Sequence, residues 1–202
     1  MALLTSQANN SATYPIKGEC NIPESSNLTF TWWMKPTTIG IQTSGIFSTS
    51  NSDATDYSST AANMRDSCFD CCNTSGTCVR INVASHLTTN EWHHYALTYN
   101  GATLTFYKDG VSKGTAAQTG ALKAFKYIFP FYSKAGGVNR TTSGGLSDFR
   151  IYVTTLSAAD ILSLYNTAAK LDNLGRLHTF EAIENIPNII FKIDSACGAK
   201  VF

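Results

Sequence analysis

The stretch that decides the fold is EWHHYALTYNGATLTFYKDG, residues 91–110. It contains two runs typical of β-strands, which are separated by Asn100-Gly101, and it ends at Asp109-Gly110. Asn-Gly and Asp-Gly readily take up the positive φ angles of tight hairpin turns. Successive side chains of a strand point to opposite faces, and in the first run both faces carry bulky residues. The stretch therefore predicts a hairpin from the middle of a layered β structure.

The motifs around this stretch follow one another in an order typical of one family. They are Trp-His-His (92–94), Tyr-Asn-Gly (99–101), Phe-Tyr-x-Asp-Gly (106–110), GGLSDFRIY (144–152), LSAADI (156–161), FTWWMKP (30–36) and GIFS (45–48). In these motifs the chain resembles the laminin-G-like, concanavalin A-like jelly-roll family over roughly residues 10 to 168. Since this sandwich hosts lectins, glycanases and structural parts, the resemblance implies a fold and leaves the function open.

The resemblance implies an all-β protein, a two-sheet antiparallel jelly-roll sandwich with one short helix near 158–169. We expect residues 1–170 to form this sandwich together with an N-terminal arm. Residues 171–202 lie beyond the match and are expected to form a β extension, used for docking or oligomerisation. This apolar tail needs a partner, either a sheet edge of the same chain or another subunit.

Local patterns place the individual elements. Ser157 and Asp160 have the spacing of a capping box, which predicts that a helix begins there. Residues 48–66 are polar and predict a long loop, and Pro130 predicts that residues 126–132 form an edge strand or contain a bulge. The strands expected on weaker patterns are 12–17, 177–184 and 189–193.

Charge excludes several classes of partner. The chain has 15 Lys+Arg and 14 Asp+Glu, a net charge of +1, so it has no basic stripe for nucleic acid or an anionic membrane. It has no apolar run long enough to span a membrane, and we expect no membrane insertion. The N-terminus lacks the charged start and apolar core of a secretory signal, so we expect no export by signal cleavage.

Four of the six cysteines lie close together, at Cys68, Cys71, Cys72 and Cys78. Cys-x-x-Cys with further thiolates can supply the four sulfur ligands of a structural zinc ion. All four crowd into one expected loop, and the spacing favours one or two disulfides, then free thiols, then zinc. These three alternatives stay open. Cys20 and Cys197 can meet only if the two ends of the chain are adjacent.

Two further sets of side chains are candidates for metal binding. His93 and His94 are neighbours on a strand and point to opposite faces, so they cannot share one ion, and a structural role is favoured. Calcium is a recurring partner of related sandwiches, and oxygen ligands are available in the polar loop. The carboxylates concerned are Asp53, Asp56, Asp66 and Asp70, although solvated acids are the commoner outcome. Our expectation is no cofactor, with calcium or zinc as the alternatives.

Sugar binding requires aromatic side chains that stack on a ring face. Tyr57, Tyr99 and Tyr107 are candidates, as is Trp33, and each is equally compatible with a place in the core. Retaining glycanases on this sandwich need two carboxylates on one strand face, typically as Glu-x-Asp-x-x-Glu, and the sequence has no such motif. We expect no catalytic residue and no enzymatic activity.

The leading interpretation is a non-enzymatic structural or adhesion protein of a virus particle. A sandwich followed at once by a short β tail resembles phage-encoded family members, such as capsid decoration, head-fibre or tail-associated proteins. Other virion proteins, further copies of the chain and surface glycans are then the expected partners, and the virion is the expected location. The alternative is a free lectin-like module, calcium-dependent or not, outside the cell or on its surface. A glycan-active enzyme is the third and weakest interpretation.

Overall fold

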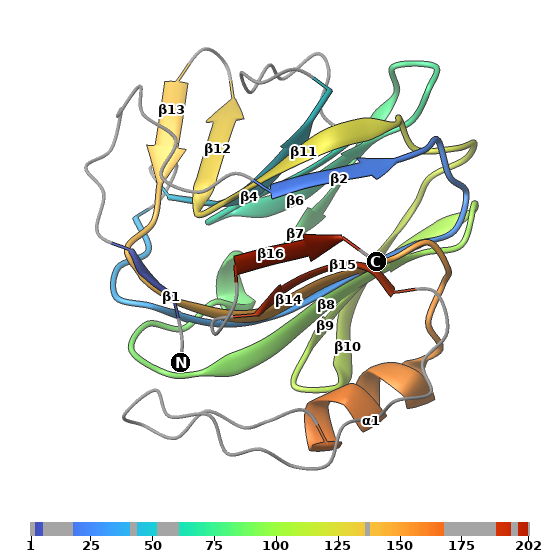
Figure 1. Ribbon diagram of the computed structural model, residues 1–202. Coiled ribbons are helices and arrows are strands. Elements are labelled where there is room, and N and C mark those ends of the chain that lie inside the picture. The colour runs from blue at the N-terminus through green and yellow to red at the C-terminus, as the bar shows by residue number, and fades with distance from the viewer. Residues whose placement is uncertain are drawn as a thin grey trace.

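The structure is a computed structural model, and it describes residues 3–5, 18–40, 44–51, 61–135, 138–167, 189–194 and 198–201. Two antiparallel sheets face each other, and one α-helix lies against the outside of one of them (Figure 1). This arrangement confirms the predicted fold class of an antiparallel sandwich with a single short helix.

The first sheet, here called sheet A, has the strand order β10-β9-β8-β3-β14-β15-β16, with β1 also paired to β14. Its strands are β1 (Leu3–Thr5), β3 (Leu28–Pro36), β8 (His93–Tyr99), β9 (Thr103–Lys108), β10 (Val111–Ala117), β14 (Gly144–Tyr152), β15 (Ile189–Asp194) and β16 (Gly198–Val201). The two motifs that carry the resemblance, around residues 92–110 and 144–152, therefore lie in one sheet.

The second sheet, sheet B, has the order β2-β11-β4-β5-β6-β7. Its strands are β2 (Gly18–Ile22), β4 (Gly45–Ser50), β5 (Ala62–Arg65), β6 (Cys68–Cys72), β7 (Cys78–Asn82) and β11 (Phe125–Pro130). A separate hairpin, β12 (Tyr132–Ala135) and β13 (Val138–Thr141), contacts β4 and β5 of this sheet. A 3-10 turn, η2 (Ala84–His86), follows β7.

The two predicted hairpin turns are confirmed. At the β8–β9 turn Gly101 has a φ of 84°, and the Asn100 side-chain oxygen accepts the backbone N–H groups of Ala102 and Thr103. At the β9–β10 turn Asp109 and Gly110 have φ angles of 52° and 77°, the left-handed region that two-residue hairpin turns require. β8 then pairs with β3 on its other side, which makes it an interior strand.

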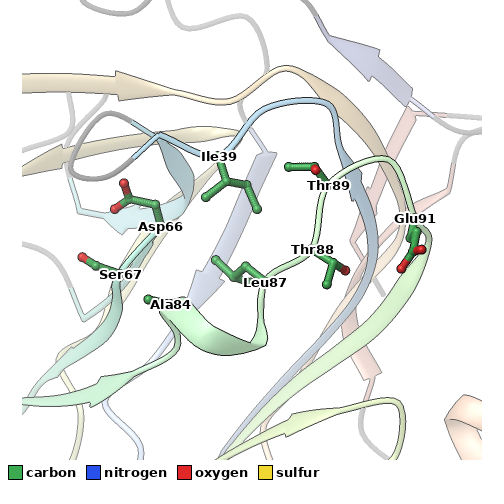
Figure 2. A pocket seen from close by; sticks show the side chains of 8 residues that line it. All are labelled: Ile39, Asp66, Ser67, Ala84, Leu87, Thr88, Thr89 and Glu91. Atoms are coloured by element: carbon green, nitrogen blue, oxygen red, sulfur yellow. The ribbon is translucent and has the colours of Figure 1, made fainter.

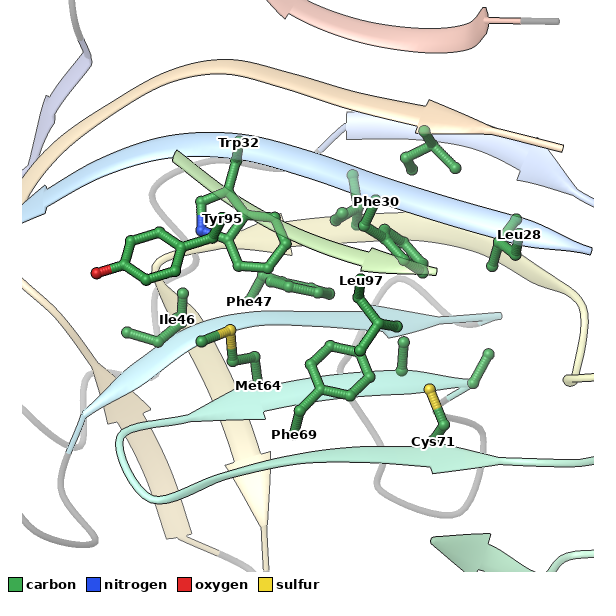
Figure 3. Close-up of a cluster of buried hydrophobic side chains, with 14 of the residues drawn as sticks. Leu28, Phe30, Trp32, Ile46, Phe47, Met64, Phe69, Cys71, Tyr95 and Leu97 are labelled. Atoms are coloured by element: carbon green, nitrogen blue, oxygen red, sulfur yellow. The ribbon is translucent and has the colours of Figure 1, made fainter. Parts of the chain in front are cut away.

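Large aromatic side chains fill the space between the sheets (Figure 3). Trp32 of β3 lies 5.2 Å from Phe47 of sheet B and 5.9 Å from Tyr95 of β8, measured between ring centroids. All three are fully buried, together with Phe69 of β6. Burial of one such side chain contributes about 1.5–3 kcal/mol relative to its exposure. This core sets the distance between the sheets and the positions of the loops at their ends.

The C-terminal strands extend sheet A. β15 pairs antiparallel with β14, with Ile193 opposite Phe149, and β16 pairs with β15. The tail was expected to pack either on a sheet edge of its own chain or on another subunit. Residues 189–194 take the first alternative. β1 uses the same edge of β14 near its start, with Leu3 opposite Leu146. The strands predicted at 12–17 and 177–184 lie outside the described residues.

Three predictions from local pattern were wrong in part. The loop expected over 48–66 is shorter, because β4 continues to Ser50 and β5 begins at Ala62. The crowded cysteine loop is a hairpin, and residues 68–72 form its first strand. β11 is not an edge strand, because it lies between β2 and β4. Its pairing with β4 is regular through Pro130, and the register shift against β2 between Phe125 and Tyr127 comes from an extra residue in β2, so the predicted bulge is not in β11.

The predicted helix is confirmed as α1 (Ala158–Thr167). The Ser157 hydroxyl accepts the backbone N–H of Asp160 at 3.2 Å, and the Asp160 carboxylate accepts the N–H of Ser157 at 2.8 Å, as in a capping box. Ile161 and Leu164 are buried against the outer face of sheet A. Within the described residues no helix has the length and hydropathy needed to cross a membrane.

Candidate binding pocket

A pocket of about 670 Å³ opens between loops at one end of the sandwich (Figure 2). Three connections form it: the β3–β4 segment, the β5–β6 turn and the segment between β7 and β8. The lining residues are Ile39, Asp66, Ser67, Ala84, Leu87, Thr88, Thr89 and Glu91. Loops held by a rigid sandwich are a common location for binding sites, and this volume is within the range of small-molecule pockets.

The walls combine an apolar pair with hydroxyl groups. Figure 2 shows the side chains of Ile39 and Leu87 facing one another across the pocket. Ser67, Thr88 and Thr89 add hydroxyl groups that can donate and accept hydrogen bonds. A ligand that presents C–H groups on one side and hydroxyl groups on the other therefore fits these walls.

Two carboxylates belong to the lining, and the protein positions both. Asp66 is only 3% exposed, and its backbone N–H donates to the Ser44 carbonyl, which ties the β5–β6 turn to the β3–β4 segment. Glu91 is exposed, and its carboxylate lies 3.3 Å from Nε2 of His93. Nδ1 of His93 lies 2.6 Å from the carboxylate of Asp109. A chain of polar contacts thus orients Glu91 at the pocket's edge.

Lys108 contacts one of the threonines that line the pocket. Nζ of Lys108 donates to the Thr88 hydroxyl at 3.4 Å. Partial burial lowers the pKa of Lys108, while the charges of Asp109 and Glu91 raise it. Lys108 is not among the residues that line the pocket. The described lining therefore contains two acids and no basic side chain.

The aromatic residues proposed for sugar stacking are elsewhere. Tyr99 is buried, and its hydroxyl donates to the carbonyl of Gly120, with the carbonyl of Gln118 also nearby. Tyr107 is 7% exposed and packs in the cluster beneath α1. Trp33 is 4% exposed and stacks on Tyr165 of the helix. None of these three rings presents a free face, because strand alternation placed them against the core or the helix, and Tyr57 lies outside the described residues.

The four candidate aspartates separate in the structure. Asp66 lines the pocket. Asp70 lies on the outer face of sheet B, where its carboxylate contacts Arg65 at 2.7 Å and Arg80 at 2.6 Å. Asp53 and Asp56 lie outside the described residues. Within the described part of the chain, no three His, Cys, Asp or Glu side chains gather as a metal site.

The cysteines also separate. Cys72 and Cys78 form a disulfide across the β6–β7 hairpin, so the disulfide alternative holds for this pair. Cys71 points into the core and Cys68 lies on the outer face of sheet B, and both are free thiols. Desolvation raises the pKa of each thiol. The four sulfur atoms do not converge as zinc ligands in this structure.

The two neighbouring histidines lie on opposite faces of β8, as predicted. His94 is 2% exposed and packs against Trp33 and Tyr165, while His93 bridges Asp109 and Glu91. Sequence reasoning missed the 84–91 segment, which supplies five of the eight lining residues. Its signal is a hydroxyl- and amide-rich run, Thr88-Thr89-Asn90, between two strands without alternation of apolar residues.

Comparison with known proteins gives the fold a family. No curated protein matches the sequence. Domain 4 of AbnA, a GH43 extracellular arabinanase from Geobacillus stearothermophilus, in complex with arabinotriose, has a TM-score of 0.57 and 14% identity, covering 72% of this chain and 71% of that one. A native heptameric SAP-like pentraxin from Limulus polyphemus has a TM-score of 0.52 and 16% identity, covering 92% and 86%.

The botulinum neurotoxin serotype G binding domain has a TM-score of 0.53 and 15% identity over 75% of this chain, which spans 40% of that domain. At these identities the likeness concerns the fold alone. The sequence itself matches the concanavalin A-like lectin/glucanases superfamily over residues 8–162, more than half of its length. The chain belongs to the concanavalin A-like lectin/glucanases superfamily.

Proposed function

We propose that this domain is a non-enzymatic carbohydrate-binding module whose pocket takes a neutral sugar. The observation that carries the proposal is the lining itself, in which the apolar pair Ile39 and Leu87 is accompanied by the hydroxyl groups of the β5–β6 turn and the 84–91 segment. A sugar ring matches such a wall, because its C–H face is apolar and its edge carries hydroxyl groups. The arabinotriose bound by the similarly folded arabinanase domain supports the same class of ligand.

The charge of the lining selects among sugars. Asp66 and Glu91 give the described lining two negative charges without a basic residue. A sialic acid or uronic acid placed there meets like charges, and each such contact is unfavourable where water is excluded. Carboxylates also accept strong hydrogen bonds from sugar hydroxyl groups. The preferred ligand is therefore a neutral pentose or hexose unit.

A binding role is favoured over hydrolysis by the placement of the two acids. Retaining glycosidases need two carboxylates about 5–5.5 Å apart, and inverting enzymes about 6.5–9.5 Å, on either side of the bond they cleave. In Figure 2 Asp66 and Glu91 stand at opposite ends of the pocket, and the carboxylate of Glu91 is already engaged by His93. This arrangement suits recognition of a ligand from both ends.

In our proposal the module acts in adhesion at the surface of a virus particle, attached to other virion proteins. This part rests on the sequence resemblance to phage-encoded family members and stays a prediction. Assembly into a homo-oligomer is part of it, and the heptameric Limulus pentraxin is an oligomer built on the same fold. Calcium is the alternative to the expected absence of a cofactor, and Asp66 is the one of its four candidate carboxylates that the pocket contains.

The test is a glycan array followed by calorimetry with the best neutral ligand, each with and without EDTA. Thr89→Ala and Glu91→Gln should each weaken binding about tenfold, because one hydrogen bond contributes about 1–1.5 kcal/mol. Thr89 and Glu91 are exposed, so folding should be unaffected. Thr115→Ala, an exposed threonine on β10, is the matched control and should bind like the wild type.

The proposal is contradicted if acidic glycans bind best, or if the two pocket variants retain full affinity. Loss of binding in EDTA would add calcium to the site, and unchanged binding would remove it. Turnover of a polysaccharide by the wild type, lost in Glu91→Gln, would replace the binding role by an enzymatic one.

A further inference from the structure

The outer face of sheet B carries a row of polar side chains under the β12–β13 hairpin. Strand register places Ser48 opposite Asn63 and Asn63 opposite Asp70. Their neighbours Phe47, Met64 and Phe69 belong to the core, so the polar residues point to the outside of the sheet. The hairpin contacts β4 and β5 (Figure 1), and Ser48, Asn63 and Asp70 are 1%, 0% and 3% exposed. Ser48 and Asn63 are therefore buried between the sheet and the hairpin, and Asp70 is buried next to them beside Arg65 and Arg80.

Three hydrogen-bond donors in this buried layer have no acceptor in the described protein. They are Oγ of Ser48, Nδ2 of Asn63 and Nε of Arg65. Arg65 lies two residues after Asn63 on β5, so its side chain leaves the same face of the strand. Buried donors are almost always paired, and three unpaired ones on adjacent positions require an explanation. Each of the three groups can donate a hydrogen bond, and Ser48 and Asn63 are direct cross-strand neighbours.

The orientation of the hairpin adds positive charge to the same layer. The Ser133 hydroxyl of β12 donates to Oδ1 of Asn63 at 2.6 Å, so this face of the hairpin points at sheet B. Arg140 of β13 is the cross-strand partner of Ser133 and thus faces the sheet as well. Arg140 is 9% exposed, and burial and the nearby charge of Arg65 both lower its pKa, while Asp66 raises it.

The nearest carboxylate on the row is already bound. One oxygen of Asp70 accepts from Nη2 of Arg65 at 2.7 Å, and the other accepts from Nε of Arg80 at 2.6 Å. Nε of Arg65 takes no part in this contact and has no partner in the described protein. The hydrogen bond from Ser133 likewise occupies the oxygen of the Asn63 amide and leaves its NH₂ group as a donor. The free groups of the layer are thus donors, next to guanidinium charge.

We infer that this layer holds a small monovalent anion, of the chloride class, bound by Nε–H of Arg65, Nδ2–H of Asn63 and Oγ–H of Ser48. A halide accepts several hydrogen bonds without directional preference, which suits three donors that belong to two adjacent strands. Because the donors are almost fully covered, a large oxyanion does not enter without displacing the hairpin. The anion neutralises the site and fixes the β12–β13 hairpin on sheet B. The inference is independent of the sugar pocket.

The direct test is crystallography of the wild-type protein grown in sodium bromide, with data collected at the bromine absorption edge. The expected result is an anomalous peak within hydrogen-bond distance of Ser48, Asn63 and Arg65. An ordered water without anomalous signal at this position overturns the inference. Because this experiment uses the unmodified chain, it does not depend on the folding of any variant.

A second test measures thermal unfolding in chloride against gluconate at equal ionic strength. If about 0.1 M chloride stands roughly a hundredfold above its dissociation constant, the wild-type Tm should rise by about 5 °C or more. Asn63→Asp keeps the acceptor for Ser133 but replaces the donor by a negative charge, so the chloride effect should vanish. Ser48→Ala removes one donor with little change in shape and should reduce the effect.

Asn82→Asp is the matched control, because Asn82 is exposed and uses only its side-chain oxygen, which accepts the N–H of Ala84. This variant should keep the full chloride effect. Equal Tm values in chloride and gluconate for the wild type, or an unchanged effect in Asn63→Asp, would overturn the inference.

Discussion

The two sheets are covered on their outer faces in opposite ways. On sheet A the helix α1 packs through apolar and aromatic groups: Trp33 stacks on Tyr165 at 5.9 Å between ring centroids, and Ile161 and Leu164 are buried. On sheet B the β12–β13 hairpin packs on a polar layer, through the bond from Ser133 to Asn63 and beside the ions around Asp70. The cover of sheet A is therefore apolar, whereas the cover of sheet B is held by hydrogen bonds and ion pairs.

This difference predicts how each cover fails. Apolar packing has no direction, and its contribution grows with the area removed from water. Polar packing under the hairpin contributes little net stability when complete, but a single missing partner leaves a buried group unsatisfied. We therefore expect truncations to dominate on sheet A and changes of charge or donor to dominate on sheet B.

The largest effect should come from the apolar cover. Trp33→Ala removes a side chain that is 4% exposed, stacks on Tyr165 and contacts the ring of His94, so the free energy of unfolding in urea should fall by about 3–5 kcal/mol. Leu162→Ala, at a 44% exposed position on the same helix, should cost less than about 1 kcal/mol. Similar losses for the two variants would mean that α1 is not packed through this face.

The next effect tests the polar cover. Asp70→Asn removes the negative charge between Arg65 and Arg80, and should cost about 2–3 kcal/mol because Arg65 is left buried without its counter-ion. Arg80→Gln, in which the lost side chain is 59% exposed, should cost no more than about 1 kcal/mol. If both variants lose the same free energy of unfolding in urea, the polar row of Ser48, Asn63 and Asp70 behaves as a solvated surface.

The sequence predicted sheet A better than sheet B, and the reason is physical. Asn100-Gly101, Asp109-Gly110 and the Ser157–Asp160 cap are local signals, because each turn or cap is made by the residues that specify it. The strands and the helix next to these signals were therefore predicted correctly. In sheet B the Cys68–Cys72 strand carries Asp70 and free thiols on positions that the sequence indicated as a polar loop. Cys71 is buried in the core and Asp70 beside Arg65 and Arg80, and no local pattern reveals either.

The pocket was predictable only in part. Asp66 could be named from its place in an acidic, polar segment, but its partners across the pocket come from the β3–β4 and β7–β8 connections. No local pattern brings these three connections together; the sandwich topology does. Tyr99 and Tyr107 occupy buried positions, the alternative that the sequence left open, because a strand pattern does not reveal that a helix from residues 158–167 covers Tyr107.

The last prediction concerns His94, a titratable side chain that is 2% exposed and lies under the apolar cover of sheet A beside Trp33 and Tyr165. Burial, aided by the charge of Arg150 and opposed by that of Asp109, lowers the pKa of His94 to about 3. The unfolded chain binds this proton near pH 6.5 and the folded chain does not, so stability is lost as the pH falls from about 6.5 towards 3, by up to about 1.4 kcal/mol per pH unit.

His94→Phe and His94→Gln both remove this titration, and both should flatten the dependence of the unfolding free energy on pH between about 6 and 4 relative to the wild type. Nδ1 of His94 has no hydrogen-bond partner in the described protein, so Phe should also be tolerated at neutral pH. If only the Phe variant flattens the profile, packing rather than protonation is responsible. If neither variant flattens the profile, His94 is protonated in the folded protein as well. The cover of sheet A then admits a charge and differs less from the cover of sheet B than the contacts indicate.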